Sequence, residues 1–235
     1  MKGQLKNGWF DLVELIIKLE EFLRIVSEVF PKQPGIDKGE KQYEDCIKHR
    51  EMWDNLSNIK VAHVRDVIVN FLNQWQCRLP YDCVPYLTAA LQRVEPLLQP
   101  LRGLGIEHVD LFKPVKIEEK EMRTISLVEN LFETIQKVRA GRRTVGFTAT
   151  SKILHMAVPN LFVMCDERIR KEYGCEGNSA GYANFMLWMS FFARDLISQA
   201  KEDKQRILSC SKWKNRTLPR LLDNYNYTKY TLKKE

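Results

Sequence analysis

The chain has 235 residues, of which 44% are hydrophobic and 29% charged, a composition typical of globular proteins and not of disordered ones. The 37 Lys and Arg against 30 Asp and Glu give a net charge of +7, which favours anionic partners, with nucleic acid first among them. No run of about 18 apolar residues occurs, so we expect no membrane span. Charged residues such as Glu14 and Lys18 interrupt the apolar N-terminal stretch, so we expect no signal peptide and no secretion.

The cysteine and histidine residues do not form a metal signature. Among the six Cys, no two are separated by only two residues, which excludes zinc-ribbon and ferredoxin-type spacings. We therefore expect reduced thiols, no metal and no organic cofactor. The expected location is the cytoplasm, where the protein would associate with the nucleoid, or the nucleus.

Apolar residues recur at helical spacing along most of the chain, with Pro and Gly at the boundaries, which predicts an all-α fold. No linker or internal repeat interrupts the pattern, so we expect a single domain over residues 1–235. The segment from Lys212 is basic and Tyr-rich, and it reads either as a plain tail or as a second patch that touches DNA. Helices are expected over 9–30, 39–54, 58–79, 84–99, 117–140, 147–157, 167–173, 179–200 and 203–211.

Positive charge is concentrated between residues 136 and 171. This segment holds eight Lys or Arg and two acids, a net charge of +6. Within it, a basic hairpin leads through Gly146 into an apolar helix that begins near Phe147. Because the first N–H groups of a helix lack partners within the helix, this arrangement can bind a phosphate. A lone acid, Asp166, follows and is expected to cap a short basic helix that ends at Gly174.

The order of a hairpin carrying Val145–Gly146, a helix of small and apolar residues over 149–158, and an aspartate at the head of a basic helix resembles the helix-hairpin-helix DNA glycosylases. This superfamily includes enzymes similar to endonuclease III and to 8-oxoguanine glycosylase. Its members are all-α, two-lobed enzymes that flip a damaged base out of double-stranded DNA and cleave its N-glycosidic bond. The resemblance implies a helix-hairpin-helix-like element at about 125–158 and a catalytic segment at 159–174, in a protein expected to be a monomer.

The same resemblance assigns roles to individual residues. Asp166 takes the position of the catalytic carboxylate, which stabilises a cationic sugar or activates water. The nucleophilic lysine of the bifunctional members is replaced by Thr148, so simple hydrolysis is expected instead of lyase chemistry. Lys152 shares a helical face with Thr148 and is a secondary candidate for a displaced Schiff-base nucleophile. The residues expected to contact DNA are Arg142, Arg143, Val145, Gly146, Phe147, Thr148, Arg168, Arg170 and Lys171.

Other interpretations stay open at this point. The family's Pro and first Gly of the hairpin are replaced by Arg143 and Thr144, and Arg168 stands where the family has His. One alternative is therefore a non-catalytic helix-hairpin-helix-like module that binds nucleic acid or a protein. Another is a helical interaction protein with an incidental basic face. Asp166 can also be a plain helix cap, and Lys152 a surface lysine with a packed stem.

Overall fold

The structure is a computed structural model that describes residues 17–117 and 119–232. It is mostly α-helical, which confirms the all-α prediction, with two short antiparallel hairpins. The part of the expected first helix that precedes residue 17 lies outside the described residues. The α-helices are α1 (Leu19–Arg24), α2 (Ile36–Ile47), α3 (Arg50–Asp54), α4 (Val61–His63), α5 (Asn70–Gln74), α6 (Val84–Leu98), α7 (Thr124–Gln136), α8 (Phe147–Ala157), α9 (Glu167–Glu172), α10 (Ser179–Gln199), α11 (Lys204–Leu208) and α12 (Leu218–Asn226).

Three helices contain π-helical turns. These turns are Ile25–Val29 after α1, Val64–Val69 between α4 and α5, and Tyr227–Thr231 after α12. The remaining elements are the strands β1 (Pro114–Ile117), β2 (Lys120–Arg123), β3 (Arg139–Ala140) and β4 (Arg143–Thr144) and the 3₁₀ turns Phe30–Lys32, Leu56–Asn58, Tyr81–Cys83 and Gln99–Leu101.

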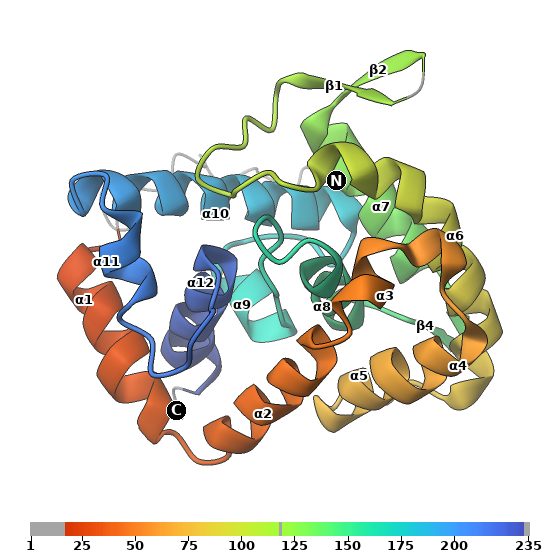
Figure 1. Cartoon of the computed structure of the whole chain (residues 1–235), viewed down its shortest axis with the longest axis horizontal. Helices are drawn as coiled ribbons and strands as arrows, with labels where there is room; N and C mark the ends of the chain where they lie inside the picture. Colours follow the sequence, from red (N-terminus) through yellow and green to blue (C-terminus); the bar gives the residue numbers. More distant parts are fainter. Residues whose placement is uncertain (1–16, 118, 233–235) are drawn as a thin grey trace, which may run out of the picture.

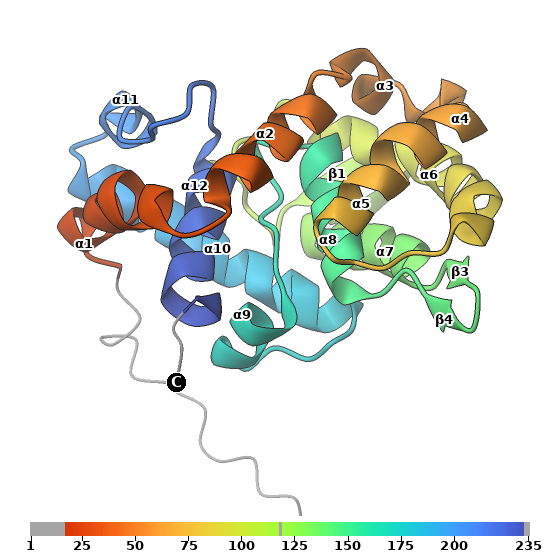
Figure 2. The same cartoon turned by 90° about the horizontal axis from the view of Figure 1, so that it is seen from below.

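The helices gather in two groups (Figures 1 and 2). Helices α1, α9, α11 and α12 lie toward one end of the molecule, and α3 to α8 lie toward the other. Helix α2 connects them on one side. Helix α10 spans the other side and packs against both α7 and α12. The buried apolar residues of both groups belong to one continuous cluster, so the groups share a core.

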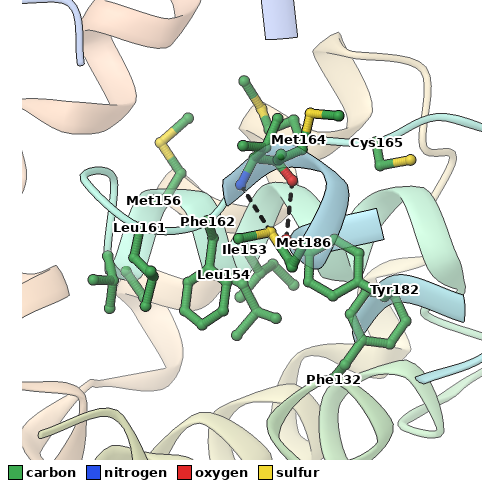
Figure 3. Packing of buried hydrophobic residues seen from close by; sticks show 14 of the residues in the cluster. Phe132, Ile153, Leu154, Met156, Leu161, Phe162, Met164, Cys165, Tyr182 and Met186 are labelled. Atoms are coloured by element: carbon green, nitrogen blue, oxygen red, sulfur yellow. Dashed lines mark hydrogen bonds between the residues drawn. The ribbon is translucent and has the colours of Figure 1, made fainter. Parts of the chain in front are cut away.

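Helix α8 lies at the centre of this core. From Ala149 to Ala157 every residue of α8 is buried except Lys152, which is partly exposed. Figure 3 shows Ile153, Leu154 and Met156 of α8 packed with residues of the following segment and of α7 and α10. A buried helix surrounded by apolar neighbours is rigid, so it can hold a functional side chain in place.

The helix expected over 117–140 is shorter than predicted. Strands β1 and β2 pair as a hairpin, and α7 begins only at Thr124 and ends at Gln136. The charged residues of 118–123 favour a helix by propensity, but they offer no apolar face to bury. The hairpin instead places Val115, Ile117 and Met122 against the core.

The expectation of a basic tail after Lys212 is also wrong for part of that segment. Arg216 and Arg220 are buried and form ion pairs with Glu40 of α2. Helix α12 is therefore an internal element, and these two arginines do not form an exposed basic tail.

Candidate functional site

A short extended segment between α8 and α9 carries Asp166, and hydrogen bonds to its backbone fix its position. Ser151 Oγ of α8 donates to Cys165 O and accepts from Cys165 N, both at 3.0 Å. Tyr182 of α10 donates its hydroxyl to Val163 O at 2.9 Å. The segment is thus held against α8 and α10, and Asp166 follows directly from it.

His155 of α8 also holds this segment. Its Nδ1 lies 2.6 Å from Phe162 O and its Nε2 lies 3.0 Å from the hydroxyl of Tyr43. Burial lowers the pKa of His155 to about 3, so the imidazole is neutral. A neutral ring that donates from Nδ1 and accepts at Nε2 satisfies both contacts. His155 therefore has a structural role.

Asp166 caps α9, as the sequence predicted. Its Oδ1 accepts from Ile169 N at 2.8 Å, and its Oδ2 accepts from Thr231 Oγ1 at 2.7 Å. Gly174, at φ +63°, follows α9 in the left-handed conformation that was also predicted. No ion pair involves Asp166 within the described part of the chain. The carboxylate is half-buried and is not sealed by a cation.

A cavity of about 500 Å³ contains this carboxylate in its wall. Helix α2 and the end of α5 form one side of the cavity, and α8, α9 and α12 with the turn after it form the other. Among the predicted site residues, Asp166, Lys152 and Thr148 all line it. The cavity lies within the usual size range of small-molecule pockets, roughly 300–1,000 Å³.

The ammonium group of Lys152 is held by contacts within the protein, unlike that of an exposed surface lysine. Its Nζ donates to Trp75 O at 3.1 Å and lies 3.6 Å from Cys77 Sγ. The same nitrogen lies 5.0 Å from the centroid of the Trp75 ring. These contacts hold the ammonium against the end of α5, at the cavity.

A second hollow of about 450 Å³ adjoins the first and shares Trp75, Gln76 and Thr148 with it. The N-terminus of α8 lines this hollow with Gly146 and Phe147. Gly146 provides no side-chain cap to α8, so the first N–H groups of this helix are left to solvent or a ligand. The two hollows therefore adjoin, with Asp166 lining the first and the N-terminus of α8 lining the second.

The other residues predicted to contact DNA differ in exposure and in whether they already have a partner in the protein. Arg142 and Arg143 lie exposed in the β3–β4 hairpin, and Val145 is buried, so its side chain is out of reach of a ligand. The three cations of α9 each have a partner in the protein. Arg168 donates to Thr231 O at 2.8 Å, Arg170 donates to Cys175 O at 2.7 Å, and Lys171 pairs with Glu167 at 2.8 Å.

Sequence reasoning missed the contribution of α12 to this site. Arg220, Asp223 and Asn224 line the cavity beside Asp166. Burial raises the pKa of Asp223 to about 6. Arg220 opposes this shift, and the nearby Asp166 charge adds to it. A helix start was readable in the sequence, because Thr217 caps α12 and Pro219 stands in its first turn.

No helix among the described residues is long and apolar enough to cross a membrane. Within residues 17–117 and 119–232, no cluster of three or more His, Cys, Asp or Glu side chains is suited to holding a metal ion. Comparison with protein-family models, with curated proteins and with solved structures finds no match to this chain.

Proposed function

We propose that this protein is a DNA glycosylase of the helix-hairpin-helix type that hydrolyses the N-glycosidic bond of a flipped damaged base. One observation carries the proposal. The Asp166 carboxylate lies in the wall of a cavity, and this cavity adjoins a second hollow that is lined by the N-terminus of α8. A base in the cavity and a phosphate at the helix terminus would be two parts of one bound nucleic acid.

The chemistry needs one carboxylate in this position. Cleavage of an N-glycosidic bond passes through a cationic, oxocarbenium-like sugar, and a carboxylate stabilises that charge or activates the attacking water. A base within a duplex cannot reach such a group, so the nucleotide must first leave the stack, at a cost of a few kcal/mol. The partly buried cavity offers the flipped base a place away from bulk water.

The flanking hairpin fits the phosphate backbone. Unpaired N–H groups at a helix N-terminus bind anions through hydrogen bonds and through the helix dipole. Arg142 and Arg143 are exposed close in sequence to this terminus, so they are available to neutralise phosphates. The cations of α9 contribute less, because each already contacts a group of the protein.

The proposal includes hydrolysis without lyase chemistry, because Thr148 offers no amine. Lys152 is the predicted candidate among the two lysines that line the cavity, the other being Lys38. Borohydride reduction on abasic DNA is therefore expected to trap no covalent adduct. An adduct that forms with the wild type and disappears in Lys152→Ala, but persists in Lys171→Ala, would assign a Schiff-base role to Lys152 and contradict this part.

The activity test uses duplexes that each carry one of a panel of base lesions, with released free base measured by chromatography. We expect the wild type to release at least one lesion and the Asp166→Asn variant to release none at a comparable rate. Release by neither protein, or equal release by both, would contradict the proposal.

A second candidate is a non-catalytic module that binds nucleic acid. The observation that favours it is that both oxygens of Asp166 already accept hydrogen bonds, from Ile169 N and Thr231 Oγ1. This candidate predicts duplex binding that weakens steeply with salt and is unchanged in Asp166→Asn, with no base released from any lesion.

A further inference from the structure

Tyr81 presents an aromatic ring at the surface in a fixed position. It begins the 3₁₀ turn between α5 and α6, and it is 56% exposed. Its hydroxyl donates to Asn70 Oδ1 of α5 at 2.6 Å, so the side chain is held at its far end as well as at its backbone. Within the part of the chain that the structure describes, Tyr81 takes part in no aromatic pair and no cation–π contact. An exposed ring that is already ordered can stack on a ligand at little cost in conformational entropy.

The turn that begins at Tyr81 lies against the β3–β4 hairpin. The turn contacts β3, and in Figure 2 the chain between α5 and α6 runs beside the hairpin. A Cβ built at Gly141, at the tip of the hairpin, would lie 3.6 Å from Pro80 Cγ and 3.8 Å from Asp82 Oδ2. Pro80 and Asp82 flank Tyr81 in the sequence, so the aromatic ring and the hairpin belong to one part of the surface.

This part of the surface is positively charged. Four exposed arginines lie in the hairpin or in the chain just before Tyr81, and they are Arg78, Arg139, Arg142 and Arg143. None of them forms an ion pair with another described residue, whereas Lys137 at the end of α7 pairs with Glu133. With the exposed Asp82 included, the group carries a net charge of +3. We call Tyr81 and these four arginines the Tyr81 surface.

An exposed aromatic ring beside several cations is the combination that binds single-stranded nucleic acid. Guanidinium groups neutralise the backbone phosphates, and unpaired bases stack on aromatic rings with little preference for sequence. Within a duplex each base is stacked between its neighbours, so its faces are not available to a protein side chain. The arginines can therefore attract either form of nucleic acid, but the Tyr81 ring adds affinity only for a strand with unpaired bases.

We propose that the Tyr81 surface binds single-stranded nucleic acid, with phosphates on the guanidinium groups and one base stacked on the Tyr81 ring. This binding goes beyond the proposed glycosylase function, which concerns a flipped base in the Asp166 cavity. It requires neither the cavity nor the Asp166 carboxylate.

The test measures the affinity of a short labelled oligothymidylate, and of a labelled DNA duplex, by fluorescence anisotropy at low salt. Tyr81→Ala should weaken binding of the single strand by about 5- to 150-fold, because one base loses its stacking partner. The duplex affinity should be the same in this variant as in the wild type. Tyr81→Phe keeps the ring and should bind the single strand more tightly than Tyr81→Ala does. Oligouridylate serves as the RNA counterpart, and binding of either strand that depends on Tyr81 supports the proposal.

Tyr86→Ala is the matched control. Tyr86 is 58% exposed, but it lies in the first turn of α6, outside the turn that contacts β3. This variant should bind the single strand as the wild type does. An unchanged affinity in Tyr81→Ala, an equal loss in Tyr86→Ala, or a wild type that does not bind either single strand would overturn the inference.

The salt dependence separates stacking from charge. The double variant Arg142→Ala and Arg143→Ala removes two phosphate contacts, so its slope of log K against log salt for the single strand should become shallower by about 1.4. Tyr81→Ala should keep the wild-type slope, because no charge is lost. Binding of a single strand that depends on Tyr81, without release of any lesion, would sustain this inference and contradict the glycosylase function. Release of a base by a protein whose strand binding is independent of Tyr81 would do the reverse.

Discussion

Gly146 adopts a backbone conformation that few other residues can adopt. It has φ +80° and ψ 172° at the start of α8, in a region essentially confined to glycine. A Cβ built there would have Thr144 O as its nearest neighbour, at 3.8 Å, so space is available and the strain lies in the backbone. The backbone angles at the junction between the hairpin and α8 therefore require glycine at position 146.

We expect Gly146→Ala to lower the free energy of unfolding by about 1–3 kcal/mol. Gly39→Ala is the control, because Gly39 lies in the interior of α2 with nothing near its would-be Cβ. That change should raise the free energy of unfolding by about 0.5–1 kcal/mol. Denaturant unfolding of both variants measures whether each change lowers or raises the free energy of unfolding. A Gly146→Ala variant more stable than the wild type would contradict the strain expected in its backbone.

Asp223 should titrate well above the usual range of a carboxyl group. Burial raises its pKa to about 6, Arg220 and Lys152 lower it, and Asp166 and Glu40 raise it. Carboxyl ¹³C NMR should find its midpoint near this value. In Asp166→Asn the midpoint should move down, because a negative neighbour that disfavours the charged form is removed.

Asp203→Asn is the control for that titration. Asp203 caps α11, as its side chain accepts from Arg206 N at 3.0 Å, and Asp203 is absent from the cavity lining. The Asp223 midpoint should be unchanged in this variant. Equal shifts in both variants would show that Asp166 does not act on Asp223 through its charge.

At the scale of elements, a buried ion network joins α2 to the segment around α12. Glu40 pairs with both Arg216 and Arg220, and the two guanidinium groups lie 5.0 and 4.8 Å from the centroid of the Tyr43 ring. Glu40 and Arg220 of this network also line the cavity. The network joins residues far apart in the sequence, so α12 depends on α2 for its position.

Glu40→Gln should lower the free energy of unfolding by about 1.5–3 kcal/mol, because Arg216 and Arg220 lose their shared charged partner but keep Glu44 and Asp223. Asp37→Asn is the control on the same helix. Asp37 pairs with Lys212 at 3.0 Å, but its side chain is 72% exposed, so this change should have little effect. Similar losses of unfolding free energy in the two variants would contradict the stabilising role of the buried ion network.

The sequence predicted some of these elements well for physical reasons. Helices α8 and α9 carry the signals that sequence reasoning uses, which are an apolar run after a glycine, an aspartate cap and a closing glycine. Helix α12 was missed because Arg220, Asp223 and Asn224 are buried there, and charged or amide side chains are normally expected to be exposed. Their burial depends on Glu40, far away in the sequence. The cavity likewise brings Trp75, Asp166 and Asn224 together by tertiary packing that no local spacing encodes.

At the scale of the whole molecule, the proposed function requires nucleic acid to contact both the β3–β4 hairpin and the Asp166 cavity. In Figure 2 the hairpin and α9 both lie along the lower side of the molecule. The β1–β2 hairpin is longer, with four residue pairs against two, and also carries cations, Lys116 and Lys120, but it projects from the top edge in Figure 1, apart from β4. The two hairpins therefore form a matched pair for a binding test.

Binding to duplex DNA should weaken with salt. In the double variant Arg142→Ala and Arg143→Ala, the slope of log K against log salt should become shallower by about two. The double variant Lys116→Ala and Lys120→Ala should keep the wild-type slope. A larger change in the second variant would place the interface elsewhere.

In the proposed function, the Asp166 carboxylate acts on a nucleotide in the cavity as well as capping α9. Single-turnover release of the best lesion should be compared between wild type, Asp166→Asn and Asp203→Asn, since asparagine caps a helix about as well as aspartate. We expect Asp166→Asn to slow release by about 10²–10⁴-fold, with an unchanged unfolding midpoint, while Asp203→Asn keeps the wild-type rate. A rate in Asp166→Asn equal to that of the wild type would contradict the catalytic role of Asp166.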